Sequence, residues 1–228
     1  MELPFADRVS AGKALAQALD SWRGAEGLLV LALPRGGVPV AFEVATAMGA
    51  ELDLLLVRKL GTPGNPELAM GAIAAGGIRV LNPDIVDALA IPAEAIEATV
   101  ACEADELARR ARAYRGSRVL PVIAGRTLIL IDDGIATGAT MRAAISALRT
   151  QQPREIVVAV PVAPPDTIAE LHHDADKIIC LATPDPFGAI GRFYQDFTQV
   201  SDDEVRVLLN RSWQALAAHS SLEKDVVR

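Results

Sequence analysis

Short, continuous apolar runs alternate with segments of helical periodicity along most of this chain, and this alternation limits the folds open to it. Several apolar runs have the length of buried strands: 28–33, 52–57, 127–131, 156–160 and 177–181. Helical patterns separate or flank them: 7–20, 38–48, 138–150, 165–172 and 202–218. Continuous apolar strands joined by helices form a parallel sheet covered by helices on both faces. The sequence therefore predicts an α/β fold whose ligands bind beyond the carboxyl ends of the strands.

Residues 82–116 interrupt this alternation with two helical patterns, a short one near 83–90 and a long one from 93 to about 114. The apolar runs before them, 68–75 and 78–81, are predicted strands, and the second is expected to extend the sheet. We therefore predict a single domain over residues 1–228. Within it, 82–116 is a helical insertion able to form a hood over a site.

The charge of the chain excludes some partners. The formal net charge is −7 at pH 7, so the chain has no overall attraction for nucleic acid or an anionic membrane. Its start lacks the pattern of a signal peptide, and no apolar run approaches the roughly 20 residues of a membrane helix. We expect a cytoplasmic protein without nucleic-acid or membrane partners, in which any bound phosphate is held by local geometry.

Two adjacent carboxylates follow one of the buried strands. In the segment Leu128–Thr140, LILIDDGIATGAT, the apolar run is followed directly by Asp132 and Asp133. Neighbouring carboxylates repel each other and resist burial. They are tolerable at a strand end that faces a wet pocket and meets hydrogen-bond donors. The vicinal hydroxyls of a sugar are such donors.

The turn after the two carboxylates opens a helix. Gly134 and Gly138 allow the backbone to approach a ligand closely. The amides of Ala136–Thr140, with a helix N-terminus behind them, form a favourable nest for a phosphate, and Thr137 and Thr140 add hydroxyl donors. The alternative is a helix cap made by Thr137 beside a solvated acidic turn. The acidic pair directly after an apolar strand favours a ribose 5-phosphate site.

This segment resembles the signature of type I phosphoribosyltransferases that binds 5-phosphoribosyl 1-pyrophosphate (PRPP). The resemblance covers roughly 5–80 and 120–200 and is strongest to bacterial predicted phosphoribosyltransferases whose acceptor is unassigned. It implies a type I phosphoribosyltransferase-like sheet in which Asp132 and Asp133 hold the ribose 2′- and 3′-hydroxyls. The implied 5-phosphate loop after the turn at Gly134 consists of Ala136, Thr137, Gly138, Ala139 and Thr140.

The segment departs from the family at two positions. Gly134 stands where the family usually has an aliphatic residue, which implies a looser turn. At Ala136 the 6-oxopurine enzymes have an aspartate that interacts with the base. The alanine argues against hypoxanthine or guanine as the acceptor, although other family members also have alanine here.

A second loop follows the first strand, as Leu33-Pro34-Arg35-Gly36-Gly37. By itself it is equally typical of a tight turn between strand and helix. The resemblance implies the pyrophosphate loop of the family, in which the amides of Gly36 and Gly37 face the pyrophosphate and Arg35 adds a charge-assisted contact. It also implies a cis peptide at Pro34-Arg35 or Arg35-Gly36.

Two cations, Arg58 and Lys59, end the second predicted strand. They fit a solvated strand end, or catalytic residues that neutralise the pyrophosphate leaving group. The segment Lys59–Pro66 is rich in glycine and proline, so we expect an exposed loop. By resemblance it is a mobile lid that keeps water away from an oxocarbenium-like transition state.

The resemblance also implies a metal and an acceptor region. Mg²⁺ is expected to bind through PRPP, with Asp132 and Asp133 reaching it only indirectly through PRPP and water. The acceptor region is 183–196, where Phe187 and Tyr194 are the candidate acceptor-binding residues. For both rings the alternative is packing of the C-terminal helix.

Three functions are consistent with these features. The first is a phosphoribosyltransferase that uses PRPP and Mg²⁺, takes a small nitrogenous acceptor such as a nucleobase and, by family analogy, forms a homodimer. The second is a non-catalytic, PRPP-sensing regulator of the same fold, although no basic DNA-binding segment is visible. The third is a sugar-phosphate hydrolase, but GxSxG, HExxH and DxDxT patterns are absent from the sequence.

Overall fold

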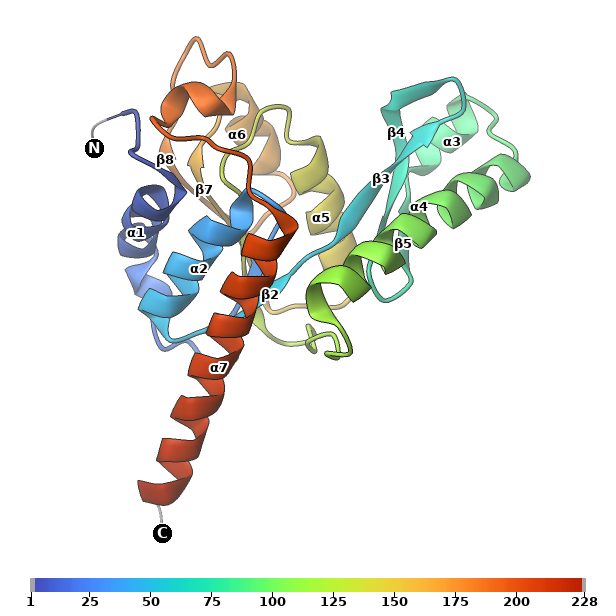
Figure 1. The fold of residues 1–228 in the computed structure, drawn as a ribbon. Helices are drawn as coiled ribbons and strands as arrows, with labels where there is room; N and C mark the ends of the chain where they lie inside the picture. The colour runs from blue at the N-terminus through green and yellow to red at the C-terminus, as the bar shows by residue number, and fades with distance from the viewer. Residues whose placement is uncertain (1–2, 227–228) are drawn as a thin grey trace. The chain divides into compact units, whose positions relative to one another are not determined.

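A computed structural model describes residues 3–226, and the chain forms two compact units (Figure 1). The first unit consists of the chain through Leu54, Gly125–Thr137 and the chain from Pro153 onward. The second consists of Leu55–Ala124 and Gly138–Gln152. The sequence predicted one domain with an insertion limited to 82–116, whereas the second unit already starts at Leu55.

A parallel sheet forms the centre of the first unit. Its strands are β1 (Leu29–Ala32), β2 (Glu51–Leu54), β6 (Thr127–Ile131), β7 (Glu155–Val162) and β8 (Lys177–Ala182). They pair in the order β2-β1-β6-β7-β8, and every pairing is parallel. All residues of β1 and β6 are buried, as their continuous apolar sequences require. The predicted α/β fold with a parallel sheet is confirmed.

Helices flank this sheet. They are α1 (Arg8–Ala18), α2 (Gly37–Met48), α6 (Pro165–Leu171) and α7 (Asp202–Val226), with the short 3-10 helices η1 (Asp20–Trp22) and η2 (Ile190–Phe193). α1 begins at a capping box, in which the Asp7 carboxylate accepts from the Ser10 amide at 2.7 Å. α1 and α2 pack side by side against the sheet, and α7 contacts α2 and β2 (Figure 1).

The second unit contains a separate, antiparallel sheet. Its strands, in the order β3-β4-β5, are β3 (Val57–Thr62), β4 (Asn65–Ala74) and β5 (Ile78–Leu81). Its helices are α3 (Pro83–Ala88), α4 (Ala93–Arg115) and α5 (Ala139–Arg149). Both helical patterns in 82–116 are confirmed. The expectation that 78–81 extends the main sheet was wrong, because β5 belongs to the three-stranded sheet, where it pairs with β4.

The segment Lys59–Pro66 is a β-hairpin instead of an exposed loop. β3 and β4 pair on either side of a turn at Pro63-Gly64, and Gly64 has a φ of 80°. The Thr62 hydroxyl donates to the Asn65 carbonyl at 3.0 Å across this turn. Glycine and proline therefore encode a tight turn between strands here. The predicted loop conformation was wrong, and the role of this segment as a mobile lid stays a prediction.

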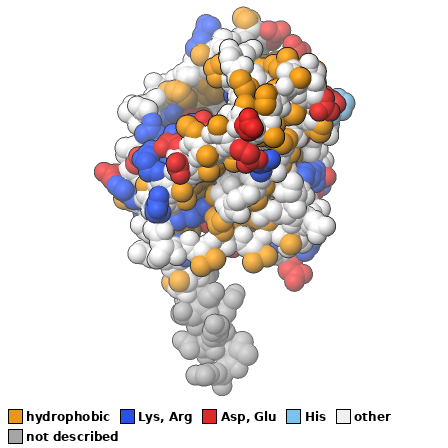
Figure 2. Space-filling model, turned by 90° about the vertical axis from the view of Figure 1, so that its right-hand side faces the viewer, with side chains coloured by type: hydrophobic (Ala, Val, Ile, Leu, Met, Phe, Trp, Pro, Cys, Tyr) orange, Lys and Arg blue, Asp and Glu red, His pale blue; other side chains and the backbone are white. Residues whose placement is uncertain are grey.

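The surface carries both signs of charge. On the face drawn in Figure 2, acidic and basic side chains are interspersed with hydrophobic ones. Among the described residues, no helix combines the length and apolar content needed to cross a bilayer.

Candidate active site

The carboxyl ends of β1 and β6 lie next to each other in the first unit. The register pairs Ala32 with Ile131, and the Leu33 amide donates to the Ile131 carbonyl at 2.9 Å. The loops 33–37 and 132–137 therefore start from adjacent points at one edge of the sheet, where ligands bind in such folds. The structure brings together the two motifs that the sequence singled out.

The two loops touch through Gly36 and Asp133. Asp133 is only 7% exposed, and a Cβ on Gly36 would lie 2.0 Å from its Oδ2. A Cβ on Gly37 would lie 2.7 Å from the Ile131 carbonyl oxygen. Glycine is thus required here for loop packing, in addition to the ligand approach expected from sequence. The Pro34-Arg35 peptide is cis, at one of the two positions expected.

The two carboxyl groups share a poorly solvated place. Asp132 is half-buried, and its Oδ1 accepts from the Asp133 amide at 2.9 Å. Burial, followed by the charge of Asp133, raises the pKa of Asp132 well above its usual value. Burial also raises the pKa of Asp133, while the hydrogen bond from Arg8 opposes that shift. The pair is therefore suited to a ligand that donates hydrogen bonds to it.

Arg8 is a site residue that the sequence analysis missed. Its Nε donates to Asp133 Oδ2 at 2.8 Å, and its Nη1 donates to the Thr198 carbonyl at 2.8 Å. Its guanidinium carbon lies 3.9 Å from the centre of the Phe197 ring. Arg8 therefore holds one carboxylate of the pair and ties it to the segment after η2. In sequence it is an ordinary residue at a helix start, far from Asp133, and no local signal identifies it.

Three hydrogen bonds to other parts of the first unit hold the loop after β6. The Ile135 amide donates to the Val162 carbonyl at 2.9 Å. The Thr167 hydroxyl donates to the Ala136 carbonyl at 2.8 Å, and the Tyr194 hydroxyl donates to the Asp133 carbonyl at 2.6 Å. Ala136 and Thr137 remain exposed. The chain then enters the second unit at Gly138, the N-cap of α5, with a φ of 73°.

Gly134 is tightly surrounded instead of lying in a loose turn. A Cβ at this position would lie 2.6 Å from Ile190 Cγ2 and 3.0 Å from Val162 Cγ2. The side chain of Ile190 thus occupies the space that an aliphatic residue at position 134 would need. The looser turn implied by the departure from the family was wrong, because a neighbouring residue compensates for it.

We predict that Gly134→Val lowers the free energy of unfolding by about 1–3 kcal/mol, because the added methyl groups overpack this contact. Thermal unfolding followed by circular dichroism measures the change. Combining it with Ile190→Ala should restore part of the loss. A Gly134→Val chain as stable as the wild type would contradict the tight contact.

The predicted cations lie in different units. The Arg35 side chain, in the first unit, is 37% exposed, and its Nη1 lies 3.5 Å from Asp202 Oδ1. Arg58 and Lys59 lie inside β3 of the second unit, and Arg58 Nε donates to Glu103 Oε2 of α4 at 2.5 Å. Their expected place at the end of the second parallel strand was wrong. That strand ends at Leu54, and the chain then enters the antiparallel hairpin.

Phe187 and Tyr194 are both buried, at 9% and 5% exposure. They belong to an apolar cluster with Phe5 and Val162, and the Phe187 ring centre lies 5.0 Å from that of Phe193. The Tyr194 hydroxyl binds the backbone of the site loop. Both rings are packing residues in this structure, but their cluster contains no described residue of the C-terminal helix α7, so the partner expected in the alternative interpretation was wrong. Their acceptor-binding role stays a prediction.

Comparisons with known proteins agree with this geometry. The family model described as "Phosphoribosyl transferase domain" matches residues 8–197. Two Mycobacterium tuberculosis proteins, from strains CDC 1551 / Oshkosh and H37Rv, are each 47% identical over 219 residues. Both carry the name "Putative phosphoribosyl transferase". The match covers 96% of this chain and 49% of each relative, so the chain spans about half their length.

A solved structure is also similar. The crystal structure of TT1426 from Thermus thermophilus is 44% identical, with a TM-score of 0.84. The match covers 92% of this chain and 99% of that one. The family match extends over most of the chain and includes both loops at the ends of β1 and β6. The chain belongs to the phosphoribosyl transferase family.

Proposed function

We propose that this chain transfers the phosphoribosyl group of PRPP to a small nitrogenous acceptor, such as a nucleobase, and releases pyrophosphate. One observation carries the proposal: the acidic pair Asp132-Asp133 at the end of β6 packs directly against the glycine loop at the end of β1. A pair of acceptors suits the diol of a ribose, and a glycine loop beside it suits the adjoining phosphates. Membership of the family supports the same ligand.

The binding roles follow from the chemistry of each segment. Asp132 and Asp133 accept hydrogen bonds from the ribose 2′- and 3′-hydroxyls. The turn at Gly134 leads into Ala136–Thr140, which holds the 5-phosphate with its amides and threonine hydroxyls. The pyrophosphate is held by the residues of the other loop, Arg35, Gly36 and Gly37. Arg8 acts through Asp133, by holding its carboxylate in place.

The reaction is a displacement at C1 of the ribose. The bond from C1 to the pyrophosphate oxygen breaks, and a nitrogen of the acceptor forms the new bond to C1. Holding the ribose by two carboxylates and the 5-phosphate loop fixes the ring for this attack. Negative charge develops on the leaving oxygen, where Arg35 stabilises it. The same task at the leaving pyrophosphate, predicted from sequence for Arg58 and Lys59, stays a prediction.

Mg²⁺ is compatible with this proposal because the oxygens of PRPP would supply most of its ligands. It prefers oxygen ligands and keeps several waters, and Asp132 and Asp133 supply oxygens that can contact those waters or PRPP. When bound, the ion neutralises part of the pyrophosphate charge. Among the described residues there is no group of three or more His, Cys, Asp or Glu side chains able to hold a metal by itself.

PRPP affinity is expected to fall as the pH is lowered from neutral. The pKa of Asp132 is raised by burial and by Asp133, so protonation begins above the usual carboxyl range. The ionised form accepts the ribose hydroxyls, and binding is lost as the pH falls through the raised pKa. Calorimetric titrations at several pH values measure this. Phosphate groups also titrate, near pH 6, so the control is Asp132→Asn, whose affinity should depend less on pH. Equal pH dependence in both proteins would contradict the role of Asp132.

A PRPP-sensing regulator is the second candidate, because the two rings expected to bind the acceptor are buried. Pyrophosphate release from Mg-PRPP, measured against a panel of nucleobases and small amines, separates the two functions. We expect release with at least one acceptor. Saturable PRPP binding without release across the whole panel would overturn transfer and favour the regulator. The cytoplasmic location and the homodimer remain predictions.

A further inference from the structure

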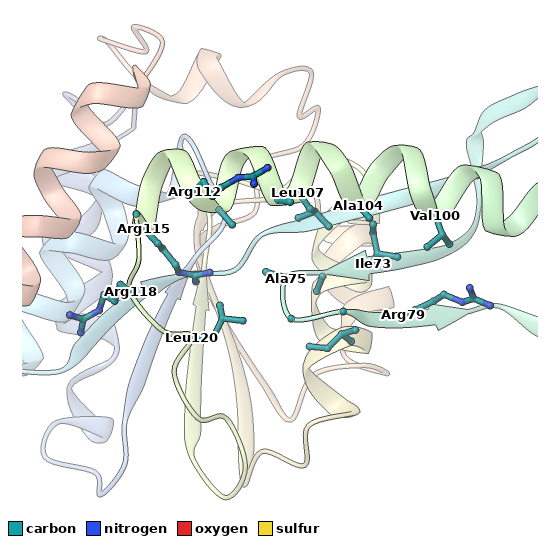
Figure 3. Close-up of a pocket in the computed structure, with 17 residues that line it drawn as sticks. Ile73, Ala75, Arg79, Val100, Ala104, Leu107, Arg112, Arg115, Arg118 and Leu120 are labelled. Carbon is teal, nitrogen blue, oxygen red and sulfur yellow. The ribbon is translucent and has the colours of Figure 1, made fainter.

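The second unit contains a cavity of about 450 Å³ that plays no part in the proposed transfer (Figure 3). It is half open to solvent and is lined by α4, by the hairpin of β4 and β5, and by the segment after α4. Cavities of about 300–1,000 Å³ are the usual size for small-molecule sites. Every residue that lines it belongs to the second unit, whereas Asp132 and Asp133 belong to the first.

The walls of the cavity are apolar. Ile73 of β4, Val100 and Leu107 of α4, and Leu120 contribute the larger side chains. Figure 3 shows these residues lining the space beneath α4. Small residues of α4, such as Ala104, leave room between them. Leu120 is 40% exposed although it is a large hydrophobic residue. An apolar ligand body would cover this surface and remove it from water.

Arginine is the only charged residue type among the lining residues. Arg79, Arg112, Arg115 and Arg118 line the cavity, and no Asp or Glu does. Arg79 is paired with Glu97 at 2.6 Å. Arg112 and Arg115 lie at the opposite end of the cavity, at the end of α4, whereas the guanidinium of Arg118 points away from the cavity (Figure 3). This local cationic end is notable in a chain of net charge −7.

We propose that this cavity binds a small amphipathic anion. Its aliphatic or aromatic body lies against the apolar walls, and its carboxylate, sulfonate or phosphate group lies at the end formed by Arg112 and Arg115. Guanidinium groups are weakly hydrated and bind oxyanions through paired hydrogen bonds. The lining has no Ser, Thr, Asn, Gln, His or Tyr side chain to recognise a sugar or a base edge, which favours an apolar body.

Arg112 and Arg115 also lie in the last turn of α4, where cations interact favourably with the helix carbonyls. That interaction needs no ligand. A test of the cavity must therefore measure ligand binding and not stability alone.

The probe is the fluorescent anion 1-anilinonaphthalene-8-sulfonate, compared with neutral N-phenyl-1-naphthylamine, which has the same rings without the charge. We expect saturable one-to-one binding of the anion to the folded chain, at least about tenfold tighter than the neutral compound, equal to about 1.4 kcal/mol. Decanoate and decyl phosphate should displace it, which shows that the site accepts the class and not only the dye.

Two variants locate the binding. Ala104→Trp fills the cavity and should weaken binding of both probes by about tenfold or more. Arg112→Gln should weaken only the anion. Arg115 is left intact because it is buried, at 7% exposure. The matched control is Arg109→Gln on the same helix, since Arg109 pairs with Glu106 and does not line the cavity. Circular dichroism checks that each variant is folded.

Three results would overturn the proposal. Anion binding that neither Ala104→Trp nor Arg112→Gln changes would place the dye elsewhere. Equal affinity for the charged and neutral probes would remove the role of the arginines. A wild-type dimer that binds neither probe, and that Ala104→Trp dissociates in sedimentation, would show that a second copy covers this surface. Each result is independent of PRPP binding.

Discussion

Replacing Asp132 and Asp133 together by asparagine is expected to weaken PRPP binding by at least about 100-fold, while the chain stays folded. Hydrogen bonds to a charged group contribute about 1.5–3 kcal/mol each, and this change removes the charge from both acceptors of the ribose diol. A 100-fold loss corresponds to about 2.7 kcal/mol. Asparagine keeps the shape of the side chain and one acceptor oxygen. The effect is therefore on ligand binding more than on packing.

The fold should survive because two opposing effects accompany this double change. Burial raises the pKa of both carboxyl groups, so removing their charge relieves unfavourable desolvation. Arg8 loses a charged partner at 2.8 Å, which is unfavourable. Calorimetry measures PRPP affinity, and Asp105→Asn, an exposed residue of α4, is the matched control. Unchanged affinity in the double variant would refute the assignment of this site.

Gly36→Ala is the second change with a large expected effect. The new Cβ would lie 2.0 Å from Asp133 Oδ2, far inside contact distance. Asp133 has little freedom to withdraw, because Arg8 holds its carboxylate and Tyr194 binds its carbonyl. Overpacking of this kind typically costs about 1–3 kcal/mol of stability. We expect a lower unfolding temperature and loss of detectable PRPP binding, measured by circular dichroism and calorimetry.

The backbone at Gly36 makes this result easy to interpret. Its φ of −61° and ψ of −34° are helical values that alanine adopts freely, so the penalty comes from the contact alone. Adding Asp133→Ala to Gly36→Ala removes the clashing carboxylate. The double variant should regain stability but not PRPP binding. A Gly36→Ala chain with the unfolding temperature and affinity of the wild type would show that the two loops do not pack as described.

Local sequence patterns were sufficient to predict the strands of the parallel sheet and the helices that flank them. β6 has the bounds predicted, and β1 and α2 agree within about two residues, because buried strands and their helices are encoded by continuous or periodic apolar residues. The β3–β4 hairpin was missed because Pro63 and Gly64 mark a turn and a loop equally well. Only the pairing with β4 distinguishes the two. Arg58 and Lys59 were misplaced for the same reason.

The candidate site likewise contains some residues that the sequence identified and others that only the structure showed. The acidic pair and the glycine loop were recognisable because each is a short motif at the end of an apolar strand. Arg8 and Thr167 were not, because each reaches the loop after β6 from a distant part of the chain. Tyr194 was named as an acceptor-binding candidate, but its hydrogen bond to the Asp133 carbonyl was not foreseen. The compensation of Gly134 by Ile190 is likewise a contact between residues far apart in sequence. Sequence patterns therefore located the two loops proposed to bind the ligand, and the structure was needed for the residues that hold these loops.

The most direct test of the central claim is to map Mg-PRPP binding on the folded chain by backbone amide chemical shifts. The account predicts saturable changes that are largest in the loops 33–37 and 132–140, and that disappear in the Asp132→Asn, Asp133→Asn chain. Asp105→Asn should reproduce the wild-type pattern. Absence of saturable changes, or largest changes outside these two loops that persist in the double variant, would contradict it.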